Sequence, residues 1–250
     1  MSEEGSSSPN GHTGSSAWRP LPWDTEFFGF PVGTADLDGL DRESVAAVVA
    51  EAREAGIVCL YGSLDSTSGP LLTDVQAMGF RFVDAATTFD LRQSEPEIPL
   101  PEGVTIRVGT SDDLDEVRDI ALRMADWSRY AVDGRFGLDA ARRLQVAWLE
   151  RAARNDDGVH SMMVAEEGGE ITAFIGRVSE PRPRVDAVGT TRRGSGAARR
   201  LIQEARWWAG DVPLLGGPIA ARNVAALRYV SHCAYRVCEV RYLYHCWLDE

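Results

Sequence analysis

Lysine is absent from the sequence, because all 26 basic residues are arginine. This absence excludes a lysine Schiff base, a lysine general base and a phosphate-binding loop that ends in Gly-Lys-[Ser/Thr]. A run of about 18 apolar residues is also missing, so no transmembrane helix is predicted. With 44% hydrophobic and 26% charged residues, the 250-residue chain is typical of a globular protein with one large domain or two modest ones.

Cysteine is scarce, and the spacing of the cysteines does not match a metal-binding motif. The four cysteines are Cys59, Cys233, Cys238 and Cys246. A structural zinc site needs closely paired ligands such as Cys-x2-Cys, and these spacings provide none. We therefore predict buried free thiols and no metal.

The net charge of −12 argues against general nucleic-acid binding, which needs a basic surface. The charge is unevenly distributed along the chain. Residues 1–100 hold 5 arginines and 16 acidic residues, whereas residues 185–245 hold 9 arginines and 4 acidic residues. A locally basic segment in an acidic protein favours a small polyanionic ligand, although chance clustering of surface arginines is the alternative.

The first 17 residues are rich in Ser and Gly and lack both a basic start and an apolar run. We predict a disordered tail here, not a signal peptide. Without a transmembrane segment or signal peptide, we expect a cytoplasmic protein that does not contact membranes.

Residues 18–93 alternate between strand and helix and are predicted to form a small N-terminal α/β domain. Apolar residues at helical spacing precede Gly56, residues 57–61 read as a buried strand, and residues 80–91 look extended. Residues 94–103 contain three closely spaced prolines that stop regular structure. We place the domain boundary in this linker.

Residues 104–250 are predicted to form a second α/β (α+β) domain in the order β-α-α-β-β-β-α-β-α-β-β. A Gly168-Gly169 turn joins two apolar runs as a hairpin, and residues 198–209 form a strongly amphipathic helix. Two strands are expected at the C-terminus, over 235–239 and 241–248. These could pair with another subunit, so a homodimer is an open prediction.

The glycine-containing segment between the strand at 185–188 and the amphipathic helix is the strongest chemical signal. It consists of Arg193, Gly194, Ser195, Gly196, Ala197 and Ala198. Backbone N–H groups at the start of a helix favour a phosphate or pyrophosphate. A dinucleotide-binding fingerprint is excluded, because Arg199 stands where it needs glycine or alanine. The pattern that remains is Arg-x-x-Gly-x-Ala, from Arg193 to Ala198. A purely structural turn is the alternative.

Together with Asn223-x-x-Ala226, this segment resembles the GNAT superfamily of acyl-CoA-dependent N-acetyltransferases. The resemblance implies a GNAT fold with a mixed central sheet, acetyl-CoA as acyl donor and no metal. It implies that residues 193–198 bind the pyrophosphate of coenzyme A. Asn223 would orient the acyl donor, or it is simply a helix N-cap.

A second resemblance begins at Trp23, in Trp-x-x-x-Phe-Phe-Gly, and continues through Ser128-Arg129-Tyr130 and Gly134-Arg135-Phe136. These segments resemble those of bacterial dTDP-fucosamine acetyltransferases, which acetylate dTDP-4-amino-4,6-dideoxygalactose. This resemblance implies a dTDP-linked amino sugar as acceptor, bound between the two domains. Trp23, Tyr130, Arg129 and Arg135 would then contact it, and core packing of the aromatic residues is the alternative.

The resemblance also implies catalytic roles. The backbone N–H of Val188 would polarise the thioester carbonyl. Tyr229 is the candidate acid, although it comes one residue earlier than the family's tyrosine, whose position is Val230 here. Asp186 precedes Val188 by two residues, so we expect it on the same strand face as a conceivable base. Two alternatives stay open: another small amine or a protein N-terminus as acceptor, or, because of the displaced tyrosine, a CoA-binding regulatory module with a degraded active site.

Overall fold

The computed structural model describes residues 17–69, 71–92, 96–233 and 235–249. The tail that we predicted to be disordered lies outside the described residues up to position 16, and so do residues 93–95 of the linker region. The strands are β1 (Trp18–Pro20), β2 (Val32–Asp36), β3 (Cys59–Asp65), β4 (Phe80–Leu91), β5 (Val104–Val108), β6 (His160–Glu167), β7 (Glu170–Val178), β8 (Arg184–Thr190), β9 (Leu214–Ala220) and β10 (Arg236–Trp247). The helices are α1 (Pro22–Phe28), α2 (Arg42–Glu54), α3 (Leu71–Ala77), α4 (Leu114–Met124), α5 (Arg129–Val132), α6 (Gly137–Arg154), α7 (Ala197–Trp208) and α8 (Val224–His232), with 3-10 turns η1 (Ser111–Asp113) and η2 (Ala125–Trp127).

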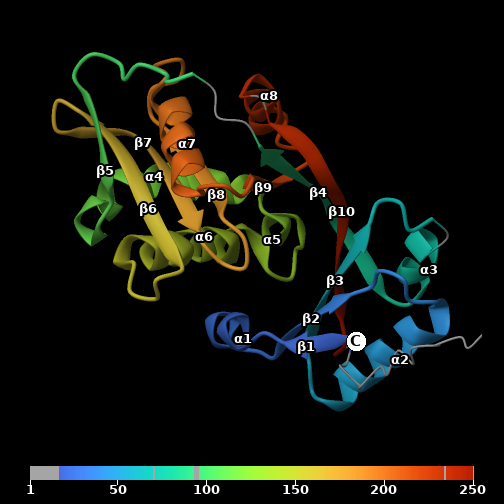
Figure 1. The fold of residues 1–250 in the computed structure, drawn as a ribbon. Helices are drawn as coiled ribbons and strands as arrows, with labels where there is room; N and C mark the ends of the chain where they lie inside the picture. The colour runs from blue at the N-terminus through green and yellow to red at the C-terminus, as the bar shows by residue number, and fades with distance from the viewer. Residues whose placement is uncertain (1–16, 70, 93–95, 234, 250) are drawn as a thin grey trace, which may run out of the picture.

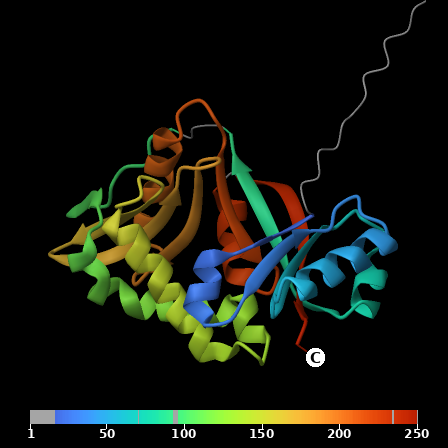
Figure 2. The same ribbon diagram turned by 90° about the horizontal axis from the view of Figure 1, so that it is seen from below.

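All strands belong to one ten-stranded mixed sheet in the order β1-β2-β3-β10-β4-β9-β8-β7-β6-β5. In the second half of the chain, α4 and α6 cover one face of this sheet and α7 covers the other (Figures 1 and 2). The predicted hairpin is β6–β7, and the predicted amphipathic helix is α7. The mixed α/β architecture expected from the sequence is therefore confirmed.

In the first half, α2 packs its predicted apolar face against the sheet beside α3. The helix begins where the Asp41 side chain accepts a hydrogen bond of 2.8 Å from the Ser44 N–H. Such a side-chain cap satisfies one of the free N–H groups of the first turn. Gly56 follows in the left-handed conformation, as expected for a residue that ends a helix.

The C-terminal segment forms one strand, so the prediction of two strands was wrong. A bulge between Val237 and Glu239 takes Cys238 out of register with β4, but the strand continues through the expected break at Val240, which pairs with Thr87. β10 lies between β3 and β4 and ties the end of the chain into the first half. The sheet continues across both halves, and the division into two domains stays a prediction.

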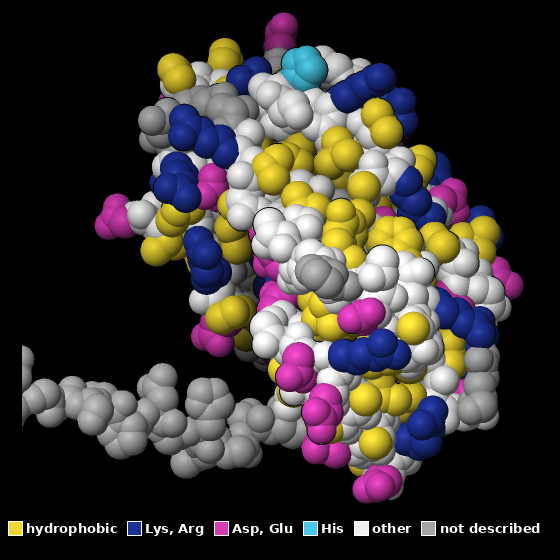
Figure 3. Space-filling model, turned by 90° about the vertical axis from the view of Figure 1, so that its right-hand side faces the viewer, with side chains coloured by type: hydrophobic (Ala, Val, Ile, Leu, Met, Phe, Trp, Pro, Cys, Tyr) yellow, Lys and Arg dark blue, Asp and Glu magenta, His cyan; other side chains and the backbone are white. Residues whose placement is uncertain are grey.

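The position of β10 limits how it could pair with another subunit. β3 pairs with the stretch from Arg241 to Trp247, and within the described chain only the edge from Arg236 to Glu239 has no β3 partner. Figure 3 shows this side of the molecule, where hydrophobic side chains form a broad band. Phe82 on β4 and Val237 on β10 are 49% and 59% exposed. The homodimer stays a prediction.

All four cysteines are free. Three are buried, as we predicted, but Cys238 is exposed. Arg236 and Val237 beside it are exposed as well, so the whole start of β10 is exposed. Among the described helices, none has the length and apolar character to cross a membrane.

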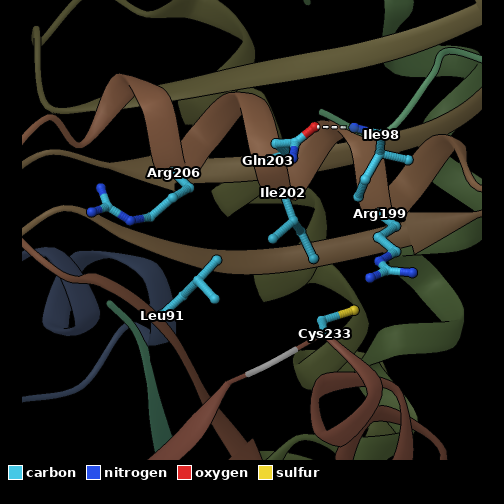
Figure 4. Close-up of a pocket in the computed structure, with 7 residues that line it drawn as sticks. All are labelled: Leu91, Ile98, Arg199, Ile202, Gln203, Arg206 and Cys233. Atoms are coloured by element: carbon cyan, nitrogen blue, oxygen red, sulfur yellow. Dashed lines mark hydrogen bonds between the residues drawn. The ribbon is translucent and has the colours of Figure 1, made fainter. Parts of the chain in front are cut away.

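The linker is held against α7 by specific hydrogen bonds. The Ile98 N–H donates to the Gln203 side-chain oxygen at 2.8 Å (Figure 4). The Gln203 amide donates to the Pro96 carbonyl at 2.9 Å. Arg206 donates to the Arg92 carbonyl at 3.0 Å. A small pocket follows this side of α7, lined by Leu91, Ile98, Arg199, Ile202, Gln203, Arg206 and Cys233.

Candidate functional site

β8 and β9 separate in the middle of the sheet. They pair in parallel only at Arg184 with Leu215 and at Val185 with Gly216. Gly217, with φ of +99°, bends β9 directly after this point, and a Cβ there would lie 2.8 Å from the Ile219 nitrogen. Only glycine fits such a backbone without strain. The remainder of β8 is left with an unpaired edge toward β9 within the described chain.

The loop from β8 to α7 opens at the same end of the strands. Gly194 and Gly196 adopt φ of +81° and +85°, and both are exposed. Gly196 is the N-cap of the 12-residue helix α7 and provides no side-chain cap, although the Ala197 N–H donates to the Ser195 hydroxyl at 3.3 Å. Arg193 is exposed beside it, and no carboxylate of the described residues lies within 4.0 Å of its guanidinium. This loop fits a phosphate or pyrophosphate group.

Other residues of the two sequence motifs have structural partners. The Ser195 hydroxyl donates to the Arg192 carbonyl at 3.1 Å and shapes the loop, and Arg192 forms an ion pair with Glu167. Asn223 caps α8, because its side-chain oxygen accepts a hydrogen bond of 3.1 Å from the Ala226 N–H. Of the two roles left open for Asn223, the N-cap is the one that the structure shows.

Asp186 and Val188 do not share a face of β8, so that expectation was wrong. A bulge in the pairing with β7 at Asp186 turns this side chain and Ala187 toward Gly176, on the side of α4. Val188 packs on the opposite side, against the core beneath α7. Residues two positions apart normally share a strand face, but the bulge inserts one extra residue between β8 and its partner β7.

The bulge gives Asp186 an unusual environment. Its side chain reaches solvent, yet the protein around it desolvates the carboxylate and raises its pKa, against the opposing effects of Arg184 and His160. A carboxyl group with a raised pKa beside an opening in the sheet is a candidate proton acceptor.

Tyr229 places its hydroxyl in the interior. Its ring packs against the same core as Val188, and the hydroxyl is buried near Cys233. Burial and the neighbouring Cys233 raise the pKa of this phenol. The phenol is therefore protonated at neutral pH, and its raised pKa makes it a weaker acid than an exposed tyrosine.

The four predicted acceptor residues lie in an aromatic cluster where α1, α5 and α6 meet β3 and β10. Tyr130 is 2% exposed, so its ring is a core residue. Trp23 is half-buried and stacks on Phe27 with ring centroids 5.4 Å apart. Arg135 is already engaged, since it binds Asp249 through two hydrogen bonds of 2.9 and 2.7 Å and lies over Trp247.

Arg129 differs from Arg135. Its guanidinium lies over the rings of Tyr61 and Tyr130, 4.5 and 4.9 Å from their centroids, and donates to the Tyr130 hydroxyl at 2.9 Å. Asp24 is close enough to interact electrostatically, but no carboxylate of the described residues lies within 4.0 Å. Arg129 is half-buried, and burial of its guanidinium works against the charged form, but Tyr130, Tyr61 and Asp24 outweigh this effect and raise its pKa.

Several residues of this region were missed by the sequence argument. Asp24 contacts the Tyr61 hydroxyl at 3.4 Å. Arg222, in the turn after β9, donates to the Ser128 carbonyl at 2.6 Å and lies 3.7 Å from Asp84. These contacts join segments far apart in the chain, and no local pattern indicates them.

His245 is a further residue that was missed, and it is fully buried beneath α5. Its Nδ1 lies 2.7 Å from an Asp133 carboxylate oxygen, and that oxygen also accepts a 3.0 Å hydrogen bond from Trp247. Since Nδ1 must donate to the carboxylate, Nε2 is the unprotonated nitrogen of the neutral ring. Nε2 is buried without a hydrogen-bond partner among the described residues.

Comparisons with known proteins identify the fold. No protein-family model and no curated protein matches the sequence. A GCN5-related N-acetyltransferase from Sphaerobacter thermophilus matches 87% of this chain and 73% of its own, with TM-score 0.56 and 19% identity. A GCN5-related N-acetyltransferase from Kribbella flavida matches 86% of this chain and 81% of its own, with TM-score 0.58 and 14% identity. A functionally unknown conserved protein from Staphylococcus epidermidis matches 95% of this chain and 94% of its own, with TM-score 0.62 and 12% identity.

These likenesses confirm the GNAT fold that the sequence motifs implied. At such low identity they concern the fold alone, and the dTDP-fucosamine subgroup stays a prediction. Within the part of the chain that the structure describes, no group of three or more His, Cys, Asp or Glu side chains could hold a metal ion.

Proposed function

We propose that this chain, which has the GNAT fold, is an acyl-CoA-dependent N-acetyltransferase. The observation that carries the proposal is the opening between β8 and β9, which ends at the N-terminus of α7, where the N-cap is a glycine. An exposed glycine loop, a helix N-terminus and Arg193 together form a site for a pyrophosphate. The unpaired strand edge beside it can accommodate an extended chain such as pantetheine.

The chain's residues then have distinct roles. Arg193 and the backbone from Gly194 to Ala198 bind the pyrophosphate of acetyl-CoA. The Val188 N–H donates to the thioester oxygen, where one such donor contributes about 10²–10³ in rate. Asp186 accepts a proton from the substrate ammonium, the free amine attacks the carbonyl carbon as the C–S bond breaks, and Tyr229 protonates the thiolate.

For the acceptor we propose a dTDP-linked amino sugar. The support is the collinear sequence resemblance together with the position of Arg129 and Trp23 on the α4–α6 side of the sheet, the side to which Asp186 also turns. Tyr130 contributes through its hydrogen bond with Arg129, and Arg135 through the packing of the cluster. The alternatives are another small amine or a protein N-terminus, and a CoA-binding regulatory module.

A thiol-release assay separates these functions. The protein is supplied with acetyl-CoA and, in turn, dTDP-4-amino-4,6-dideoxygalactose, dTDP-3-amino sugars, polyamines and peptides. Release with the dTDP-amino sugars supports the full proposal. Release with polyamines or peptides alone refutes the nucleotide-sugar acceptor, and binding of CoA without release on any amine favours the regulatory module.

A further inference from the structure

The guanidinium of Arg129 lacks the partner that half-buried arginines usually have. Two tyrosine rings and one tyrosine hydroxyl surround it, and no carboxylate of the described chain is within 4.0 Å. Rings and hydroxyls satisfy a cation only in part, and a bidentate oxyanion satisfies it fully. The remaining N–H donors of Arg129 are therefore available to a ligand.

Two carboxylates flank Arg129, and each is held by another group. Asp24 accepts a hydrogen bond from the Tyr61 hydroxyl at 3.4 Å. Asp84 has a side chain only 7% exposed and lies 3.7 Å from the Arg222 guanidinium. Burial raises the pKa of both carboxyl groups. The strongest effect in the opposite direction comes from Arg129 for Asp24 and from Arg222 for Asp84. Arg222 is thus the main cation that compensates the buried Asp84, and Arg129 acts on it more weakly.

Arg222 is held in place independently of Asp84. Its guanidinium donates to the Ser128 carbonyl at 2.6 Å, directly before Arg129 in the chain. The turn after β9, the strand β4 and the start of α5 therefore meet around Arg129. This arrangement keeps Asp84 next to Arg222, while Arg129 has no carboxylate of the described residues within 4.0 Å.

We propose that Arg129 selects the acceptor by binding a phosphate or carboxylate oxyanion of the amine substrate, and that Arg222, by pairing with Asp84, keeps Arg129 available. The inference rests on the proposed function in calling this ligand the acceptor. Arg129 determines specificity by direct contact. Arg222 is a positioning residue that acts through Asp84.

The oxyanion site is tested by titrating the full chain with dTDP, inorganic pyrophosphate and succinate, in separate experiments without acyl donor. We expect Arg129→Met, which keeps an apolar stem over the tyrosine rings, to weaken binding 10- to 100-fold. Arg143→Met, an exposed arginine on α6, should bind like the wild type. Arg193→Met identifies binding at the α7 loop, since only anions bound there are lost with it.

Binding of dTDP and pyrophosphate but not succinate identifies the oxyanion as phosphate, and the reverse identifies a carboxylate. If the wild-type protein binds none of the three, or if Arg129→Met binds as tightly as the wild type, the proposal is overturned. Unchanged circular dichroism and unfolding temperature show that a loss of binding is not a loss of fold.

The role of Arg222 is tested by rescue. Arg222→Gln leaves Asp84 unpaired, so Arg129 should turn toward it, and binding of the anion should weaken 3- to 10-fold. Adding Asp84→Asn removes the competing charge and should restore binding. A merely structural role for Arg222 would leave the double variant as weak as the single one, and this result would overturn that part of the proposal.

The two proposals fail in different ways. Anion binding that depends on Arg129, with no acetyl transfer to any amine, contradicts the proposed function and leaves this site intact. Acetyl transfer to amines that carry a phosphate or carboxylate, at equal rates in wild type and Arg129→Met, supports the enzyme and overturns the selection by Arg129.

Discussion

The buried His245 makes a specific prediction about acid stability. Its imidazole has no exposed surface, and Nδ1 is 2.7 Å from the Asp133 carboxylate. Burial lowers the pKa of His245 from 6.5 to about 4, against the opposing effect of its hydrogen bond with Asp133. The folded protein therefore holds a neutral ring over a pH range in which the unfolded chain holds a charged one.

The sign and size of the effect follow from these two pKa values. Between pH 6.5 and 4 the unfolded state binds a proton that the folded state does not, so the free energy of unfolding falls as the pH decreases. The loss reaches about 3 kcal/mol near pH 4. Burial opposes the ionisation of Asp133, but hydrogen bonds led by His245 lower its pKa from 3.8 to about 2, so it stays ionised in this range.

Urea unfolding between pH 4.5 and 7 measures this contribution. His245→Gln should keep a donor for Asp133 but remove the titrating ring. The slope of its free energy of unfolding against pH should therefore correspond to about one proton fewer than in the wild type. His232→Gln, at the exposed end of α8, is the matched control and should follow the wild type. Equal slopes for His245→Gln and wild type, or an NMR titration of His245 near pH 6.5, would refute the reasoning.

Three further predictions concern the opening in the sheet. Gly217→Ala should destabilise the fold by about 2–3 kcal/mol in thermal unfolding, because φ is +99° and the new Cβ meets the Ile219 nitrogen at 2.8 Å; an unchanged melting temperature would contradict the bend in β9. Asp186→Asn should slow acetyl transfer and remove the acidic limb of the pH–rate profile. Because the pKa of Asp186 is raised from 3.8, the midpoint of that limb in the wild type should lie above pH 3.8. An unaltered profile excludes Asp186 as the base. Tyr229→Phe should reduce the rate about 10²–10⁴-fold with little change in the binding of CoA, and an unchanged rate removes it from the mechanism.

The sequence was sufficient for the elements whose signals are local. The apolar stripe of α7, the Gly168-Gly169 hairpin and the end of α2 at Gly56 all lie where periodicity and turn residues place them. The glycine segment before α7 likewise adopts the open loop that its residues indicate. In each case the determining interactions lie within a few residues of one another.

The parts that the sequence did not predict depend on long-range packing or on irregular strands. Neither bulge, at Asp186 or at Cys238, interrupts the apolar pattern strongly enough to be recognised. The insertion of β10 between β3 and β4 joins residues nearly 200 positions apart. The pairing of Arg222 with Asp84, and of His245 with Asp133, follows from that topology and has no local signal.

The most direct test of the central claim is hydrogen–deuterium exchange with and without CoA, which locates the donor site without assuming an acceptor. The account predicts that CoA slows exchange in the loop from Arg192 to Arg199 and along the open edge of β8 after Val185. Arg193→Met should weaken this protection, while Arg143→Met should not. Protection confined to the pocket along the side of α7, at Leu91, Ile98 and Cys233, or no protection at all, would contradict it.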